Sequence, residues 1–228
     1  FRSKKMNYIP AIKKIAEFHY VGKHLGKNHD ESFKLFRKAS EMGDIESQEL
    51  LARCYKEGIG VTVNYEEAFK WYMESYEKGN KKSSVGLAYL YENGFGVPQD
   101  IEKSVFFYKI GVSEGDIVSA LALAFIKEKQ ESYIDAFSLF EKAAYAGNDI
   151  AQFKLGEYYC NGKVEKSVEK GIFWLEKAAE KDNLDSLNLL GKYYEDKNIE
   201  KALEYFQRAL KFHDKDANFN IANYYLDK

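Results

Sequence analysis

The sequence predicts an all-α protein, a right-handed α-solenoid of stacked antiparallel helix pairs, and three observations carry this prediction. Proline occurs only twice in 228 residues, which suits helices because an internal proline costs about 3 kcal/mol. Two interleaved series of small residues recur along the chain with a period of roughly 31 to 36 residues. Apolar residues near them follow the i, i+4 spacing of helices rather than the alternation of strands.

The first series of small residues marks one helix of each repeat, helix A. Its pairs lie five positions apart, at Ala11/Ala16, Ser47/Ala52, Ser83/Ala88, Ser119/Ala124, Ala151/Gly156, Ser186/Gly191 and Ala217/Ala222. The second series marks helix B with pairs seven positions apart, at Ser32/Ala39, Ala68/Ser75, Ser104/Gly111, Ala136/Ala143, Gly171/Ala178 and Ala202/Ala209. Short side chains let two helices approach within about 8–10 Å. One hairpin cannot bury both of its faces, so neighbouring hairpins are expected to stack.

One repeat illustrates the expected local structure. Helix A runs over about Ser47–Glu57 and helix B over about Tyr65–Lys78. Glycines follow successive B helices, where a left-handed residue ends a helix at no steric cost. They stand at Gly43, Gly79, Gly115 and Gly147, and the residues expected to cap the next helix are Asp44, Asn80 and Asp116.

The loop between helices A and B carries a second signature. It reads GIGVTVNYEEA at Gly58–Ala68 and GFGVPQDIEKS at Gly94–Ser104, with a degraded version, GKHLGKNHDES, at Gly22–Ser32. Together with YEKGN and SEGD at the repeat ends, these segments resemble the Sel-one-like repeat (SLR) family, which is related to the tetratricopeptide repeat (TPR). The resemblance covers about Ile9 to Tyr225. It implies a scaffold or adaptor that binds other proteins.

The repeats divide the chain evenly. We expect a single repeat domain over residues 1–228, with repeats at about 9–44, 45–80, 81–116, 117–149, 150–183 and 184–215 and a terminal helix at 216–228. The fourth repeat lacks the Gly-x-Gly loop and the sixth is shortened. Both ends look cut, so we expect the sequence to be a fragment of a longer chain.

Composition narrows the class of partner. The net charge is −2 and only four of the 34 basic residues are arginine, which argues against a nucleic-acid partner. No apolar run approaches the roughly 18 residues of a membrane span, so no direct membrane insertion is expected. The sequence does not identify the compartment, which we expect to be the cytoplasm or, if an upstream signal peptide has been removed, the periplasm or the exterior. The sequence does not fix an oligomeric state.

No catalytic residue, metal site or cofactor is expected. His19, His24 and His29 are close together in the sequence but lack accompanying ligands in a recognised spacing. The Gly-x-Gly loops follow no strand and precede no Gly-Lys-Ser/Thr, so they are interpreted as turns. Cys54 and Cys160 have no base at a recognisable spacing and are interpreted as packing residues.

The face of each helix A is the expected binding surface, because A helices line the concave side of such stacks. The residues expected there lie one position before the first small residue and two, six and nine positions after it. In the second repeat they are Glu46, Glu49, Arg53 and Lys56. In the middle repeats the apolar ones are expected to form one band, namely Val85, Tyr89, Val118, Leu121, Phe125, Ile150 and Phe153.

Exposed apolar patches with a charged rim are typical of protein interfaces. The predicted anchors are Tyr89, Phe125 and Phe153, with Val85, Val118 and Leu121 beside them. The predicted rim is Lys82, Glu92, Glu157 and Lys192. Two alternatives stay open at this point: tight curvature buries the band, or the facing assignment is wrong by one residue.

The sequence therefore predicts a non-enzymatic scaffold that binds a peptide or another protein on its concave face. The alternative is a bacterial immunity or virulence factor that clamps a toxin or a host protein. A helical-repeat enzyme is a third class, but none of the residues above supports it.

Overall fold

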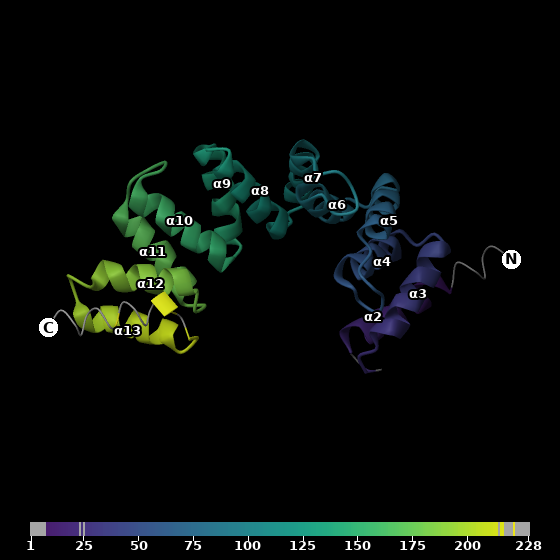
Figure 1. Ribbon diagram of the computed structural model, residues 1–228, viewed down its shortest axis with the longest axis horizontal. Helices are drawn as coiled ribbons and strands as arrows, with labels where there is room; N and C mark the ends of the chain where they lie inside the picture. Colours follow the sequence, from purple (N-terminus) through teal and green to yellow (C-terminus); the bar gives the residue numbers. More distant parts are fainter. Residues whose placement is uncertain (1–7, 23, 25, 214, 217–220, 222–228) are drawn as a thin grey trace. The chain divides into compact units, whose positions relative to one another are not determined.

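The computed structural model describes residues 8–22, 24, 26–213, 215–216 and 221. Over these residues the regular elements are helices, and no strand is present. Figure 1 shows the helices following one another as antiparallel hairpins. The fold class predicted from the sequence is confirmed. The chain divides into two compact units, Phe1–Ser119 and Ala120–Lys228.

The first unit contains three complete hairpins. They pair α2 (Ile9–Val21) with α3 (His29–Glu41), α4 (Ile45–Glu57) with α5 (Tyr65–Glu77), and α6 (Ser83–Asn93) with α7 (Ile101–Ser113). Consecutive hairpins pack through α3 against α4 and through α5 against α6. The next helix, α8 (Ile117–Lys129), begins in this unit and continues into the second. Even-numbered helices are therefore the predicted A helices and odd-numbered ones the B helices.

The second unit continues the same alternation. It contains α9 (Tyr133–Tyr145), α10 (Asp149–Asn161), α11 (Val168–Ala179), α12 (Leu184–Tyr194) and α13 (Ile199–Leu210). Each of these helices packs against the next. The terminal helix expected at 216–228 lies outside the described residues except at positions 216 and 221.

The small residues lie where the helices cross. From Ala16 to Ala209, every described member of the two series is buried. Some also bond across the crossing: the Ser32 hydroxyl donates to the Ala16 carbonyl at 3.0 Å, and the Ser75 hydroxyl donates to the Ile45 carbonyl at 2.8 Å. Ala11 is the exception. It is exposed on α2, which no described helix precedes.

Aromatic rings fill the space between crossings in a repeating arrangement. A ring from a B helix meets a tyrosine of the following A helix edge-to-face, with centroids 5.3 to 5.5 Å apart in the pairs Phe33–Tyr55, Phe69–Tyr91 and Phe137–Tyr159. Such a geometry is favoured by the quadrupoles of the two rings. The same two positions of the repeat therefore join successive hairpins at these three places, which lie in both units.

The two glycines of a Gly-x-Gly loop have different structural roles. The first glycine ends helix A in a left-handed conformation, as at Gly94 with φ of 69°. The second glycine lies against the preceding repeat: a Cβ on Gly96 would fall 2.4 Å from the carbonyl carbon of Tyr65, at the start of α5. The loop then ends at Asp100, whose side chain accepts a hydrogen bond from the backbone N–H of Lys103 and caps α7.

Gly96→Ala is expected to destabilise the protein more than Gly79→Ala. Both glycines have positive φ, but a Cβ on Gly79 would meet nothing within 4 Å. Gly79→Ala should cost only the left-handed strain, about 1–2 kcal/mol. Gly96→Ala adds overpacking against rigid backbone, a further cost of about 1–3 kcal/mol. Urea unfolding followed by circular dichroism measures both, and equal losses of stability would contradict this account of the second glycine.

Candidate partner-binding site

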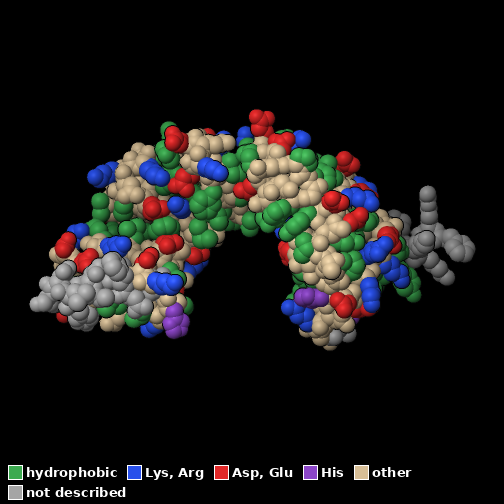
Figure 2. All heavy atoms as spheres, in the orientation of Figure 1, with side chains coloured by type: hydrophobic (Ala, Val, Ile, Leu, Met, Phe, Trp, Pro, Cys, Tyr) green, Lys and Arg blue, Asp and Glu red, His purple; other side chains and the backbone are tan. Residues whose placement is uncertain are grey.

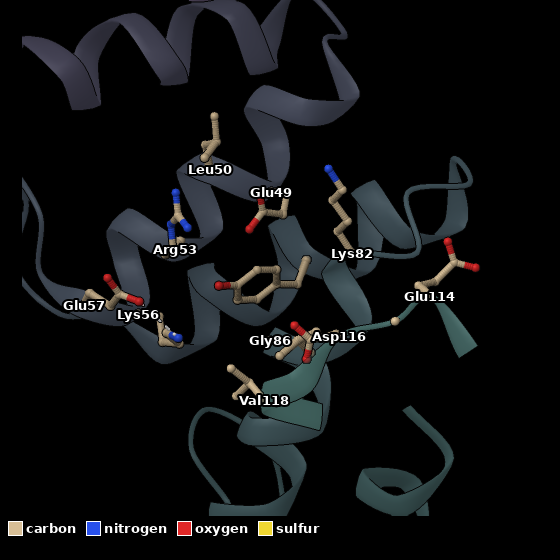
Figure 3. A pocket seen from close by; sticks show the side chains of 13 residues that line it. Glu49, Leu50, Arg53, Lys56, Glu57, Lys82, Gly86, Glu114, Asp116 and Val118 are labelled. Carbon is tan, nitrogen blue, oxygen red and sulfur yellow. Dashed lines mark ion pairs between the residues drawn. The ribbon is translucent and has the colours of Figure 1, made fainter. Parts of the chain in front are cut away.

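The first unit contains an open groove with a volume of about 700 Å³. It is formed by α4, α5, α6, the loop between α7 and α8, and the first turn of α8. Figure 3 shows these side chains converging on the space between the helices. The lining residues are Glu49, Leu50, Arg53, Lys56, Glu57, Tyr72, Lys82, Val85, Gly86, Glu114, Gly115, Asp116 and Val118.

Sequence-predicted A-helix positions come together in this groove. Three come from α4, two from the start of α6 and one from α8: Glu49, Arg53, Lys56, Lys82, Val85 and Val118. Residues three and four apart share one face of a helix, so a single face of each A helix supplies them. Val118 is 63% exposed and Val85 half-buried, so this part of the apolar band is open to solvent.

The facing pattern inferred from the sequence was too narrow. Leu50 and Gly86, three positions after the first small residue of their helices, also line the groove, as does Glu57. Helical spacing alone could have found them, since Leu50 lies four residues after Glu46 and three before Arg53. Tyr72, Glu114 and Asp116 come from a B helix and a loop, and no A-helix pattern could have placed them.

The absence of a side chain at Gly86 determines which residues form the floor of the groove. A Cβ at this position would lie 2.4 to 2.6 Å from ring atoms of Tyr72. Because α6 carries no side chain here, the Tyr72 ring can approach its backbone, and the ring is almost fully buried. The floor of the groove is therefore aromatic and aliphatic, with charged side chains around it.

Most of the acidic groups in the groove already have partners. Glu57 pairs with Lys56 at 3.2 Å, and Glu114 pairs with Lys81 at 3.1 Å. The Asp116 carboxylate accepts the backbone N–H of Ser119 at 2.6 Å, at the start of α8. These contacts neutralise or satisfy three of the four carboxylates that line the groove.

Arg53, Lys82 and Glu49 are different, because none makes an ion pair or side-chain hydrogen bond to any described residue. The Arg53 guanidinium lies over the Tyr20 ring, 5.3 Å from its centroid. Its Nε is buried without a hydrogen-bond partner. Figure 3 shows Glu49 between Arg53 and Lys82 in this view. Burial raises the pKa of the Glu49 carboxyl, although Arg53 and Lys82 act in the opposite direction.

The other predicted residues of the first unit have contacts of their own. Tyr89 is 37% exposed, and the Lys56 Nζ lies 5.2 Å from its ring centroid. Glu92 accepts a hydrogen bond from the Tyr108 hydroxyl at 2.7 Å, within the α6–α7 hairpin. Glu92 is thus held by its own repeat, whereas Tyr89 presents part of its ring to solvent.

In the second unit the predicted residues gather around Lys154. Its Nζ lies 5.9 Å from the ring centroids of both Phe125 and Phe153, and it pairs with Glu157 at 3.0 Å and Glu128 at 3.5 Å. Lys154 is not among the predicted residues, yet it lies three positions after the small residue Ala151, as Leu50 lies three positions after Ser47 in α4.

The remaining predicted residues of this unit differ in burial. Phe125 is 38% exposed with its ring edge-to-face on Phe140, and Ile150 and Lys192 are exposed. Leu121 is half-buried. Phe153 packs against the cluster that contains Leu175, Leu187 and Leu190, so it is part of the core as well as of the surface.

Cys54, His24 and His29 have chemically reactive side chains, but each of them packs against neighbouring residues. Burial raises the pKa of the Cys54 thiol to about 12, so it is not a thiolate nucleophile at neutral pH. His24 packs edge-to-face on Phe18, and His29 stacks on Tyr20. In the part of the chain that is described, no three His, Cys, Asp or Glu side chains are placed to hold a metal ion.

The arrangement is that of a TPR-like α-solenoid repeat protein with an open groove on its A helices. The family model of the Sel1 repeat matches residues 9–44, 45–80, 82–116, 128–148, 149–183 and 185–211, and the chain belongs to this family. Its fourth match is the shortest, in the repeat that lacks the Gly-x-Gly loop. Sel1 repeat proteins generally mediate protein–protein interactions.

Solved structures extend this likeness. A protective antigen of uropathogenic Escherichia coli with an SLR fold is 30% identical, with a TM-score of 0.84; the match covers 96% of this chain and 49% of the antigen. The chain thus spans about half the length of that protein.

Two more distant structures show the fold alone. A Sel1 repeat protein of Oxalobacter formigenes is 22% identical over 90% of this chain and 89% of its own, with a TM-score of 0.79. An immunity protein of Pseudomonas aeruginosa is 16% identical over 92% and 82%, with a TM-score of 0.53. No curated protein matches the sequence significantly. Among the described helices, none has the length and apolar character needed to span a membrane.

Glu49→Gln is expected to change the pH dependence of stability. A carboxyl whose pKa is raised on folding holds its proton more tightly in the folded state. Its contribution to stability is therefore present below its unfolded pKa, about 4.3, and is lost as the pH rises through the folded value. Wild type should lose stability relative to Glu49→Gln as the pH rises from about 4 to 7.

Urea unfolding at several pH values measures this difference. Glu77→Gln removes an exposed carboxyl of α5 and is the matched control. Parallel profiles for wild type and Glu49→Gln would contradict the burial of the Glu49 carboxyl.

Proposed function

We propose that this chain is a non-enzymatic adaptor that holds a peptide or the edge of another protein on its A helices. The observation that carries the proposal is the open groove of the first unit, where exposed Val118 and half-buried Val85 lie among charged side chains. An apolar centre with a charged rim is the usual composition of a protein interface. The proposal agrees with the general role of Sel1 repeat proteins.

A protein partner fits the groove better than a nucleic acid does. The groove contains four carboxylates, and the chain has a net charge of −2. Figure 2 shows acidic and basic side chains interspersed over the face in view. Nucleic-acid binding needs a concentrated basic surface to replace counterions along the phosphates. Catalysis is not part of the proposal, because the Cys54 thiol is buried and protonated at neutral pH.

The test removes an apolar contact from the groove without disturbing the core. Val118→Ser changes the second residue of α8, and Ile134→Ser changes the second residue of α9, which is 75% exposed and outside the groove. The wild type and both variants are used for affinity capture from the cells that make this protein. A bound protein should be retained by wild type and Ile134→Ser and weakened about tenfold by Val118→Ser, the effect of losing one buried valine.

Quantitative mass spectrometry measures the bound proteins, and circular dichroism establishes that all variants remain folded. Equal capture of every protein by Val118→Ser and wild type would contradict binding in the groove. The double variant Tyr89→Ser/Phe125→Ser extends the test to the predicted aromatic anchors of both units. If it retains all partners, the aromatic residues do not act as anchors.

A second candidate function is an immunity or virulence role in which the chain clamps a toxin or a host protein. It is favoured by the 30% identity to a protective antigen of uropathogenic E. coli over 96% of this chain. Expressing the chain in bacteria together with a toxin encoded beside its gene tests this candidate. Survival that requires the chain and is lost with Val118→Ser would support it, and toxin sensitivity unchanged by the chain would oppose it.

A further inference from the structure

The groove of the first unit contains two cations, Arg53 and Lys82, that make no ion pair with a described residue. Glu57 and Glu114 have lysine partners, and Asp116 caps α8. Lys56 is likewise paired, with Glu57. Four groups that line the groove are left without an ion pair to a described residue: Arg53, Lys82, Glu49 and Asp116. Their charges cancel while Glu49 is ionised and sum to one positive charge when Glu49 is neutral, the form that its burial favours.

Arg53 is positioned by its contact with the Tyr20 ring. The guanidinium carbon lies 5.3 Å from the centroid of the Tyr20 ring, in cation–π contact. No side-chain hydrogen bond or ion pair to a described residue uses its N–H donors, and the Nε–H is buried without a partner. Leaving a buried donor unpaired is unfavourable. The group is therefore already positioned to donate to an acceptor that enters the groove.

We propose that Arg53, together with Lys82, binds the carboxylate of an aspartate or glutamate side chain in a protein partner. An apolar side chain next to that acidic residue lies against Val85 and Val118. This inference rests on the function proposed above and specifies the chemistry of the partner. A planar carboxylate matches the guanidinium fork with two parallel hydrogen bonds.

The charges around the groove favour a carboxylate over a phosphate. With Glu49 neutral, the groups without an ion pair carry one positive charge in all, which a carboxylate balances. A phosphate group carries about −1.5 to −2 at neutral pH and would lie near Glu57, Glu114 and Asp116, which also line the groove. Repulsion from these three carboxylates disfavours the larger charge. The aliphatic surface of Val85 and Val118 suits the neighbouring apolar side chain of a peptide.

The experiment is selection from a phage-displayed library of random linear peptides on the immobilised protein. The same selection is run on Arg53→Gln and on Arg37→Gln. Arg37 is the matched control, because it is an exposed arginine of α3 that pairs with Glu41 outside the groove. Wild type and Arg37→Gln should enrich peptides with an acidic residue beside an apolar one, and Arg53→Gln should not.

Fluorescence anisotropy on one enriched peptide then assigns the contact. Arg53→Gln should weaken its binding about tenfold or more, as expected for a charge-assisted pair. Replacing the acidic residue of the peptide by its amide should weaken binding similarly. Combining both changes should add little further loss, because each removes the same interaction. Arg53→Lys should restore part of the affinity, since it keeps the charge but loses the fork. Thermal unfolding establishes that the variants fold.

Each other outcome overturns the inference. Enriched peptides without acidic residues, bound equally by wild type and Arg53→Gln but weakly by Val118→Ser, would refute the carboxylate site while leaving the proposed function standing. A library that yields no enriched peptide would count against both. Competition by inorganic phosphate at concentrations where sodium acetate has no effect would identify a phosphate site instead.

Discussion

The structure depends on the close approach of successive helices, which only small side chains at the crossings permit. The two series of Ala, Ser and Gly residues are buried along the described helices from Ala16 onward, and hydroxyls such as that of Ser32 bond directly across the crossing. A larger residue there would separate the helices and break the edge-to-face contacts between aromatic rings that join one hairpin to the next. The crossings also decide which side of each A helix is left uncovered.

The groove follows from the same constraint. Once the small residues of α4 and α6 face their neighbours, Arg53, Lys56 and Val85 must face the other way, because side chains of one helix keep a fixed angular relation. Close approach also depends on a small residue at Gly86, where the missing side chain lets the Tyr72 ring of a B helix approach the backbone of α6. Core packing and the surface open to a partner are therefore set by one pattern of residue sizes.

That dependence explains how far the sequence could predict the structure. Helix pairs, repeat limits and the groove positions of α4, α6 and α8 all follow from spacing along one helix. The groove residues of other elements do not follow from this spacing, because Tyr72 belongs to a B helix and Glu114 and Asp116 belong to a loop. The sequence also gave no way to know that Glu92, predicted at the rim, accepts a hydrogen bond from Tyr108 in its own hairpin. A pattern of positions predicts which face of a helix a side chain lies on, whereas its hydrogen-bond partners depend on how the helices pack.

Pairing also distinguishes the A-helix surfaces of the two units. In the second unit Lys154 lies near Phe125 and Phe153, and Glu128 and Glu157 both pair with it. That surface combines aromatic rings with a cation whose charge is already compensated. In the first unit the cation near the aliphatic floor is Arg53, which is fixed by Tyr20 and has no anion as partner. A desolvated hydrogen bond to a charged group discriminates between partners more sharply than apolar contact does. Under the proposed function, we therefore expect the groove of the first unit, among the described residues, to be where a partner is selected.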